Sequence, residues 1–139
     1  TGNIGNKKVY AIKPLTFMNN SGICIRELIE YFKIEAENVI VFHDDLDVSF
    51  GKIKAKFGGS SAGHNGIESI DKFIGKDYSR VRIGIGIPNG KGDAANHVLK
   101  DFDEEEKVEL ENMTKNITNS LPILLDKKLD LFSSTVNNK

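Results

Sequence analysis

Short apolar segments of strand type alternate along this chain with segments of helical periodicity, and this alternation restricts the fold more than any other feature. Val39–Phe42 is a continuous apolar run, as expected of a buried strand. Arg80–Ile87 places apolar side chains at every second position, which is strand periodicity. Between them, positions 67, 70, 73 and 74 are apolar at helical spacing. The pattern predicts an α/β fold, with a mixed twisted sheet flanked by helices.

Three segments in the first half of the chain add further elements. A short strand is expected at Lys8–Ile12. A helix should follow it, capped by Asn20 or Ser21, with apolar side chains at positions 25, 28, 29 and 32. Lys52–Phe57 alternates lysine with apolar residues, so a strand there would carry its lysines on one face.

The last third of the chain predicts one helix and a loose end. Asp103 and Glu106 form a capping-box pattern for a helix that runs through Ile117. Pro122 should bend or end this helix, because proline lacks the backbone donor that a helix interior requires. The polar tail Ser133–Lys139 is expected to be frayed.

The size and composition of the chain favour one globular domain over residues 1–139. The 139 residues are 39% hydrophobic, enough for one core and too few for two. No apolar run has membrane-spanning length, so we expect no membrane partner. The single cysteine, Cys24, excludes an internal disulfide and suits a reducing compartment. We therefore expect a cytoplasmic protein.

Positive charge is concentrated in one part of the chain. The net charge is only -1, which argues against a general nucleic-acid-binding protein. Residues 51–91 nevertheless contain eight Lys or Arg and three acids, whereas residues 101–130 contain nine acids and four bases. Lys54 and Lys56 lie in the expected strand Lys52–Phe57, and Arg80 and Arg82 in the expected strand Arg80–Ile87. If these two strands are neighbours in the sheet, the four cations would converge on a phosphate. The alternative is ordinary solvated charge on two faces.

An acidic cluster, His43-Asp44-Asp45-Leu46-Asp47, directly follows the expected buried strand. Ligands usually bind at such strand ends in open α/β sheets. His43 and Asp44 are adjacent and would point to opposite faces, so they cannot pair with each other. His43, Asp45 and Asp47 would share a face and are residue types that bind a divalent metal, although no fourth ligand stands at a defined spacing. A solvated acidic turn is the other interpretation.

Two loops carry further polar groups. Pro14–Gly22 is interpreted from residue types alone as a capping loop in which Phe17 and Met18 fill the core. Gly58–Gly66 is rich in glycine and serine and leads into a helix, where exposed N–H groups attract anions. The alternative for this second loop is a flexible connection capped by Asn65, with His64 as a surface side chain.

Four segments of this chain, in order, resemble the bacterial peptidyl-tRNA hydrolase family. The resemblance extends from about Val9 to the C-terminal helix. It implies a single α/β globule that needs no metal or cofactor and hydrolyses the ester joining a peptide to the 3′-terminal ribose of tRNA. The segments are Thr16-Phe17-Met18-Asn19 with Ser21-Gly22, His43-Asp44-Asp45-Leu46-Asp47, Gly63-His64-Asn65-Gly66 and Arg82-Ile83-Gly84-Ile85-Gly86.

The same resemblance implies roles for the residues nearest the reaction. Asp44 would hydrogen-bond the catalytic histidine and stabilise its charged form. Asn19 would hold the attacking water or the peptide moiety. Phe17 would form part of an apolar wall against the peptide or the terminal adenosine.

The resemblance also implies how tRNA is held. Asn65, with His64 beside it, would bind substrate near the 3′ CCA end. Lys56 and Arg82 would clamp the 5′-phosphate region, with Lys54 flanking them. The expected partner is peptidyl-tRNA, and the expected state is a monomer.

The chain departs from the family pattern in one major respect. The family opens with a strand that ends in a Gly-x-x-Asn-Pro-Gly loop, followed by a helix whose Arg-His-Asn motif supplies the general base. Neither is found here, and none of His43, His64 and His97 matches that base. We therefore expect that an N-terminal segment is lacking and that the chain by itself is inactive. Ala62 stands where the family often has glycine.

Two other functions remain open from the sequence. One is a non-catalytic, RNA-binding relative of the same fold, which should have lost the chemistry of Asp44 and Asn19. The other is a metal-dependent phosphoesterase centred on the cluster from His43 to Asp47.

Overall fold

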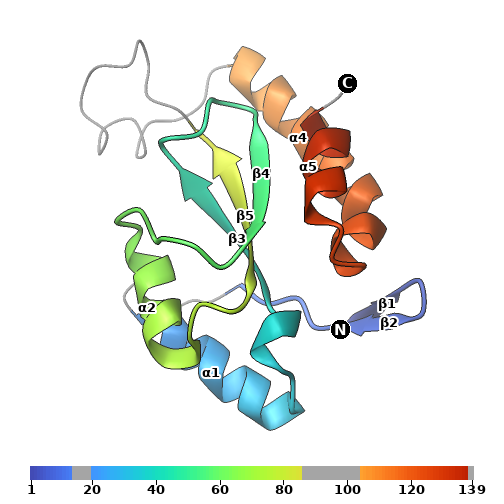
Figure 1. Ribbon diagram of the computed structural model, residues 1–139. Helices are drawn as coiled ribbons and strands as arrows, with labels where there is room; N and C mark the ends of the chain where they lie inside the picture. Colours follow the sequence, from blue (N-terminus) through green and yellow to red (C-terminus); the bar gives the residue numbers. More distant parts are fainter. Residues whose placement is uncertain (14–19, 86–103, 138–139) are drawn as a thin grey trace. The chain divides into compact units, whose positions relative to one another are not determined.

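The described residues include a three-stranded sheet. The computed structural model describes residues 1–13, 20–85 and 104–137. The strands β3 (Ile40–Asp45), β4 (Ile53–Phe57) and β5 (Ser79–Gly84) form the sheet in the order β3-β5-β4, so β5 is central (Figure 1).

Backbone hydrogen bonds give the strand directions. The N–H of Ser79 donates to the carbonyl of Val39 and that of Ile85 to Asp45, a constant offset that makes β3 and β5 parallel. Against β4 the numbering runs in opposite senses: Gly58 N–H donates to the Tyr78 carbonyl, and Gly84 N–H to the Lys52 carbonyl. β4 and β5 are therefore antiparallel, and the predicted mixed sheet is confirmed.

The chain forms two compact units. The first unit comprises Thr1–Val41 and Lys56–Arg80, and the second comprises Phe42–Ala55 and Val81–Lys139. The expectation of one domain over residues 1–139 stays a prediction.

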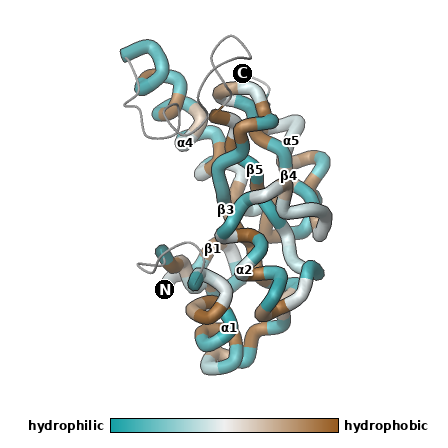
Figure 2. The backbone as a smooth tube through the Cα atoms, turned by 90° about the vertical axis from the view of Figure 1, so that its left-hand side faces the viewer, coloured by the Kyte–Doolittle hydropathy of each residue, from teal (hydrophilic) through white to brown (hydrophobic). Residues whose placement is uncertain are grey.

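The first unit is built on two helices that pack closely. α1 (Ser21–Phe32) and α2 (Asn65–Ile74) each carry both hydrophobic and hydrophilic residues along their length (Figure 2). Gly22 allows this approach, because a Cβ there would overlap the backbone of Ser69, and its N–H donates to Ser69 Oγ at 3.0 Å. The shared core consists of Ile25, Ile67, Ile70 and Tyr78.

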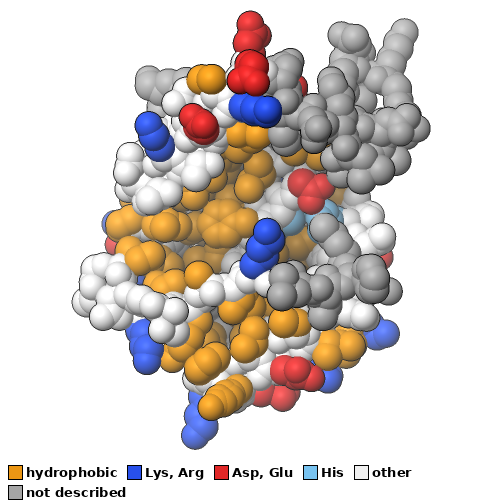
Figure 3. Space-filling view, turned by 180° about the vertical axis from the view of Figure 1, so that it is seen from behind, with side chains coloured by type: hydrophobic (Ala, Val, Ile, Leu, Met, Phe, Trp, Pro, Cys, Tyr) orange, Lys and Arg blue, Asp and Glu red, His pale blue; other side chains and the backbone are white. Residues whose placement is uncertain are grey.

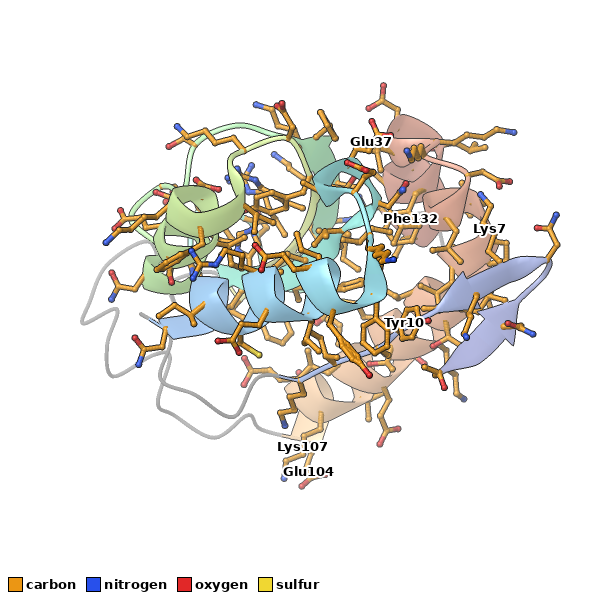
Figure 4. All side chains as sticks on the ribbon, turned by 90° about the horizontal axis from the view of Figure 1, so that it is seen from below. Lys7, Tyr10, Glu37, Glu104, Lys107 and Phe132 are labelled. Atoms are coloured by element: carbon orange, nitrogen blue, oxygen red, sulfur yellow. The ribbon has the colours of Figure 1, made fainter. Side chains whose placement is uncertain are left out.

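A hairpin precedes these helices. β1 (Gly2–Ile4) pairs with β2 (Lys7–Val9) in antiparallel register. The expected strand at Lys8–Ile12 is therefore shorter and begins one residue earlier. Tyr10, just past the hairpin, stacks on Phe32 of α1 with ring centroids 4.1 Å apart (Figure 4).

The second unit contains two C-terminal helices, α4 (Glu104–Leu125) and α5 (Leu129–Asn137). Glu104 and Lys107 form an exposed ion pair at 3.7 Å in the first turn of α4 (Figure 4). The buried apolar side chains of this unit come from α4, α5 and the strand region: Val48, Ile53, Val81, Met113, Leu124, Phe132 and Val136.

The prediction of a frayed tail is wrong. α5 includes most of that segment, and Phe132 and Val136 bury 100% and 96% of their surface. Ser133 Oγ accepts a hydrogen bond from Ala55 N, and Asn137 bonds both backbone groups of Ile53. The tail is ordered because its side chains satisfy the backbone of β4.

Pro122 lies inside α4 and does not end it at once: the helix continues through this residue and ends at Leu125, three residues later. A bend at Pro122 stays a prediction. Asp103 and Ile87 lie outside the described residues. The predicted capping box of Asp103 and the predicted extension of the strand to Ile87 are therefore not tested.

Two smaller expectations change in the first half of the chain. Asn20 occupies the N-cap position of α1, but its side chain makes no capping hydrogen bond. β3 continues to Asp45, and Phe42 within it is 43% exposed, so this strand is not fully buried as predicted.

Hydrophobic side chains also reach the surface, as the face in Figure 3 shows. Among the described residues, no helix is long and apolar enough to cross a membrane. The large apolar side chains exposed in the described part of the chain are Ile12, Ile23, Tyr31, Phe32, Phe42, Phe57, Val108 and Leu131.

Candidate active site

The acidic cluster belongs to the second unit, and its first three residues, His43 to Asp45, lie within β3 rather than after it. Asp45, the last residue of the strand, is 9% exposed and pairs with Arg82 of β5. Arg82 Nε donates to Asp45 Oδ2 at 2.7 Å, and the N–H of Asp47 donates to Asp45 Oδ1 at 2.8 Å. Both carboxylate oxygens of Asp45 are therefore hydrogen-bonded.

The charge state of Asp45 follows from this environment. Burial alone would raise its pKa, but the Arg82 guanidinium and the Asp47 N–H bond the ionised form and lower its pKa below the ordinary value of 3.8. The charge of Arg82 and the electrostatic effect of the nearby His43 lower the pKa of Asp45 as well. Asp45 is therefore a carboxylate over the physiological range.

His43 and Asp44 are half-buried neighbours of this pair. His43 Nδ1–H donates to the carbonyl oxygen of Asp44 at 2.9 Å, which fixes the ring beside its own backbone. Because side chains alternate along a strand, Asp44 and Asp45 face opposite sides of β3. The two carboxylates therefore lie on different sides of the sheet, and Arg82 pairs with Asp45.

Lys54 stands across from Arg82. The bond from Gly84 N to Lys52 O sets the antiparallel register, so two residues further along each strand Lys54 and Arg82 are opposite one another. Lys54 is exposed, and the Arg82 side chain keeps 29% of its surface exposed while its Nε is bonded. Two neighbouring cations at a sheet surface are suited to a phosphate group.

The metal interpretation finds no support in this geometry. Asp45 is committed to Arg82, and the described residues hold no group of three or more His, Cys, Asp or Glu that would suit a metal ion.

The glycine-rich loop belongs to the first unit. It takes left-handed backbone angles at Gly58, Gly59, Ala62 and Gly63, and it leads into α2. His64, rather than Asn65, caps that helix: its Nδ1 accepts a hydrogen bond from Ile67 N at 3.2 Å. An accepting Nδ1 is unprotonated, so a neutral His64 carries its proton on Nε2. Asn65, the first helical residue, is exposed.

Of the four cations expected to converge on a phosphate, Arg80 is not available to one. Arg80 is 2% exposed and pairs with Asp71 at 2.8 Å, so that expectation is wrong for Arg80. Lys56 is exposed but belongs to the first unit, whereas Arg82 belongs to the second. Their clamp therefore stays a prediction, and so does any joint site of Asp44 and Asn65.

Three sequence candidates, Phe17, Asn19 and His97, lie outside the described residues. Two carboxylates with structural partners were not anticipated. From the sequence, Asp45 is a candidate metal ligand or part of a solvated acidic turn, and Asp71 is only one of the acids counted in residues 51–91. The sequence signal for the first pair is the opposite charge of Asp45 and Arg82, each of which lies in or next to a predicted strand.

Comparison with known proteins gives a consistent result. A family model described as peptidyl-tRNA hydrolase matches residues 1–139. The peptidyl-tRNA hydrolase of Pelagibacter ubique is 81% identical over 139 residues, which is all of this chain and 75% of that protein. That of Gluconobacter oxydans is 43% identical over 136 residues, covering 97% of this chain and 72% of that protein.

Solved structures agree with the fold. A crystal structure of a variant peptidyl-tRNA hydrolase from Acinetobacter baumannii superposes with a TM-score of 0.87 at 31% identity. The match covers 99% of this chain and 70% of that one.

Proposed function

The chain belongs to the peptidyl-tRNA hydrolase family, and we propose that the protein hydrolyses the ester bond between peptide and tRNA. The observation that carries this proposal is the 81% identity to a peptidyl-tRNA hydrolase over all 139 residues. The reaction is a carboxylic-ester hydrolysis that returns tRNA to translation. It would take place in the cytoplasm, with the protein acting as a monomer.

In the proposed mechanism water attacks the ester carbonyl with the help of a histidine base. Asp44 accepts a hydrogen bond from that histidine, which fixes its tautomer and stabilises the imidazolium formed when it takes the proton. Asn19 holds the water or the adjoining peptide, and Phe17 provides an apolar surface beside them. These groups suffice for an ester, which needs only a modest base and oriented donors.

The basic residues hold the tRNA. Arg82 offers its terminal guanidinium nitrogens to a phosphate while Asp45 holds Nε, and Lys54 adds a second charge from the opposite strand. Lys56 contributes a third charge to the 5′-phosphate region. Asn65 and His64 bind near the 3′ end, where the exposed start of α2 favours negative groups.

Separating binding from chemistry tests this division of roles. In the full-length enzyme, Asp44→Asn should lower kcat strongly and leave tRNA affinity close to wild type. Lys56→Ala and Arg82→Ala should raise KM far more than they lower kcat, because phosphate contacts position the substrate. Each should also flatten the slope of log affinity against log salt by about one unit or less.

Metal dependence distinguishes the competing functions. Hydrolysis of peptidyl-tRNA that persists after treatment with a chelator would exclude the phosphoesterase. Equal loss of activity in Asp44→Asn, Asp45→Asn and Asp47→Asn, restored by a divalent metal, would overturn the proposal. Tight tRNA binding by the full-length protein without any turnover would instead identify the non-catalytic RNA-binding relative.

A polypeptide of residues 1–139 alone should not hydrolyse peptidyl-tRNA. Its three histidines are His43, His64 and His97, and none matches the base of the family's Arg-His-Asn motif. In the described structure, His64 Nδ1 is occupied by the cap of α2. Full turnover by a sample whose intact mass corresponds to these 139 residues would show that the base lies among them, and His64→Ala would be the first variant to assay.

A further inference from the structure

A buried polar cluster lies beside the glycine-rich loop in the first unit. Arg80 of β5 is 2% exposed, and its Nη2 donates to Asp71 Oδ1 of α2 at 2.8 Å. The same carboxylate oxygen accepts the hydroxyl of Tyr78 at 2.7 Å. The Arg80 guanidinium also lies over the Tyr78 ring, 4.6 Å from its centroid.

The cluster is bonded directly to the loop. Arg80 Nη1 donates to the carbonyl oxygen of Ser60 at 3.3 Å, and Gly58 N–H donates to the carbonyl oxygen of Tyr78 at 2.9 Å. Arg80 therefore joins two parts of the chain that stand on either side of the start of α2. Ser60 comes four residues before the cap His64, and Asp71 lies in the helix itself.

Stability alone is a weak reason for this arrangement. Removing two charges from water costs more free energy than a buried ion pair commonly returns, and apolar replacements are often neutral or stabilising. Among the residues that the structure describes, Arg80 Nε is buried without a hydrogen-bond partner, which adds to that cost. Burial and the Asp71 carboxylate raise the pKa of Tyr78, so its hydroxyl remains a donor to Asp71.

The loop itself needs an external support. Its left-handed positions include Ala62, a residue that adopts φ +49° only at a cost in free energy. The bond from Ala62 N–H to Ser60 Oγ holds the turn locally, and His64 N–H donates to the Ser61 carbonyl. These bonds lie within the loop, whereas the Arg80 bond fixes Ser60 to the sheet.

We propose that Arg80 is a positioning residue for the substrate site at the start of α2. Held by Asp71, it fixes the Ser60 carbonyl and so sets where His64 and Asn65 are presented to the 3′ end of the tRNA. This inference rests on the proposed function, which assigns substrate binding to those two residues. Arg80 itself does not contact the substrate in this scheme.

Arg80→Lys is the main test, made in the full-length enzyme. Lysine keeps the charge opposite Asp71 but lacks the planar fork that reaches Asp71 and Ser60 together. We expect a Tm close to wild type, amide hydrogen exchange in residues 58–63 about tenfold faster, and KM for peptidyl-tRNA raised about tenfold with kcat changed less than about threefold. The double variant Asp71→Leu with Arg80→Met removes the ion pair entirely and should give the same KM increase.

Ile70→Val is the matched control. Ile70 lies on α2 beside Asp71 and is 3% exposed, so the change lowers the Tm without touching the loop. It should leave both loop exchange and KM unchanged.

The two readouts separate the possible failures. Unchanged loop exchange in Arg80→Lys would overturn the inference, whatever the enzyme's activity. Faster loop exchange with wild-type KM would show that the anchored loop does not position substrate, and would also overturn it. Failure of the wild-type enzyme to hydrolyse peptidyl-tRNA would sink the proposed function, and tRNA affinity in place of KM would then decide the role of Arg80.

Discussion

Asp45 Oδ2 accepts a hydrogen bond from Arg82 Nε at 2.7 Å, from the end of β3 to the neighbouring strand β5. The side chain of Asp45 is 8% exposed and that of Arg82 is 29% exposed. The acid is thus buried, while part of the base reaches solvent. Asp45 consequently fixes the direction in which Arg82 presents its remaining donors.

Asp45→Asn should weaken tRNA binding without disabling the reaction. The amide keeps the shape of the carboxylate but not its charge, so Arg82 is held less firmly. We expect KM for peptidyl-tRNA to rise by about threefold to tenfold, with kcat within about threefold of wild type. Steady-state kinetics at two salt concentrations measures both. Asp47→Asn is the control, because Asp47 bonds Asp45 through its backbone and its own side chain is exposed; an equal KM increase there would contradict the pairing role.

Asp45 should also make stability depend on pH in acid. Its pKa in the folded protein is below the ordinary 3.8, so its contribution to stability is complete above that value and is lost as pH falls through the lower, folded-state pKa. The unfolding free energy of wild type relative to Asp45→Asn should therefore be constant above about pH 5 and decrease below about pH 4. Urea titrations of both proteins from pH 3 to pH 7 would measure this. A difference that grows on acidification would mean that the pKa is raised instead.

Ala62 and Gly63 form a matched pair for backbone strain. Their φ angles are +49° and +80°, and a Cβ added at Gly63 would meet nothing within 4 Å, so conformation alone decides the outcome. Ala62→Gly should leave stability unchanged or raise it by up to about 1 kcal/mol, since relief of strain is partly offset by the freedom glycine gains in the unfolded chain. Gly63→Ala should lower stability by about 1 kcal/mol or more. Thermal unfolding of both variants checks the prediction, which fails if the two effects have the same sign.

Asn137 should be important for stability although it lies two residues from the end of the chain. Its Oδ1 accepts from Ile53 N at 3.0 Å and its Nδ2 donates to Ile53 O at 2.8 Å, so it completes the backbone bonding of β4 at that point. Asn137→Ala should lower the unfolding free energy by about 1–3 kcal/mol, because it leaves both groups of Ile53 without this partner. Asn112→Ala, at an exposed position of α4, should change it by about 0.5 kcal/mol or less. If chemical denaturation gives the same loss of unfolding free energy for Asn137→Ala and Asn112→Ala, the hydrogen bonds of Asn137 do not stabilise the protein.

The sequence predicted those elements whose side chains follow a simple period. The spacing of Ile67 and Ile70 identified α2, and the alternation around Ile53 identified β4 with its lysines on one face. Periodicity is a local property of the chain, so it can be recognised without a partner. The order of the four family segments likewise depends only on the residue string, and it identified the family before any contact was known.

Pairing between distant side chains had to come from the tertiary structure. Ser133–Lys139 has few apolar residues, and its sequence resembles that of a loose tail. Asn137 nevertheless forms a hydrogen bond with the backbone of Ile53, 84 positions away along the chain. Arg80 and Arg82 have the same charge and stand at alternate positions of one strand. Arg80 is nevertheless buried and paired with Asp71, whereas Arg82, paired with Asp45, is partly exposed.

The sequence by itself thus determined the α/β class, the family and which residue types are available for chemistry. The tertiary structure alone decided which cation faces solvent, which residue caps α2 and whether the C-terminal segment is ordered. The physical reason is that burial and hydrogen bonding depend on groups brought together from far along the chain. The free energy of such a contact depends on its surroundings as well as on the identity of the two residues.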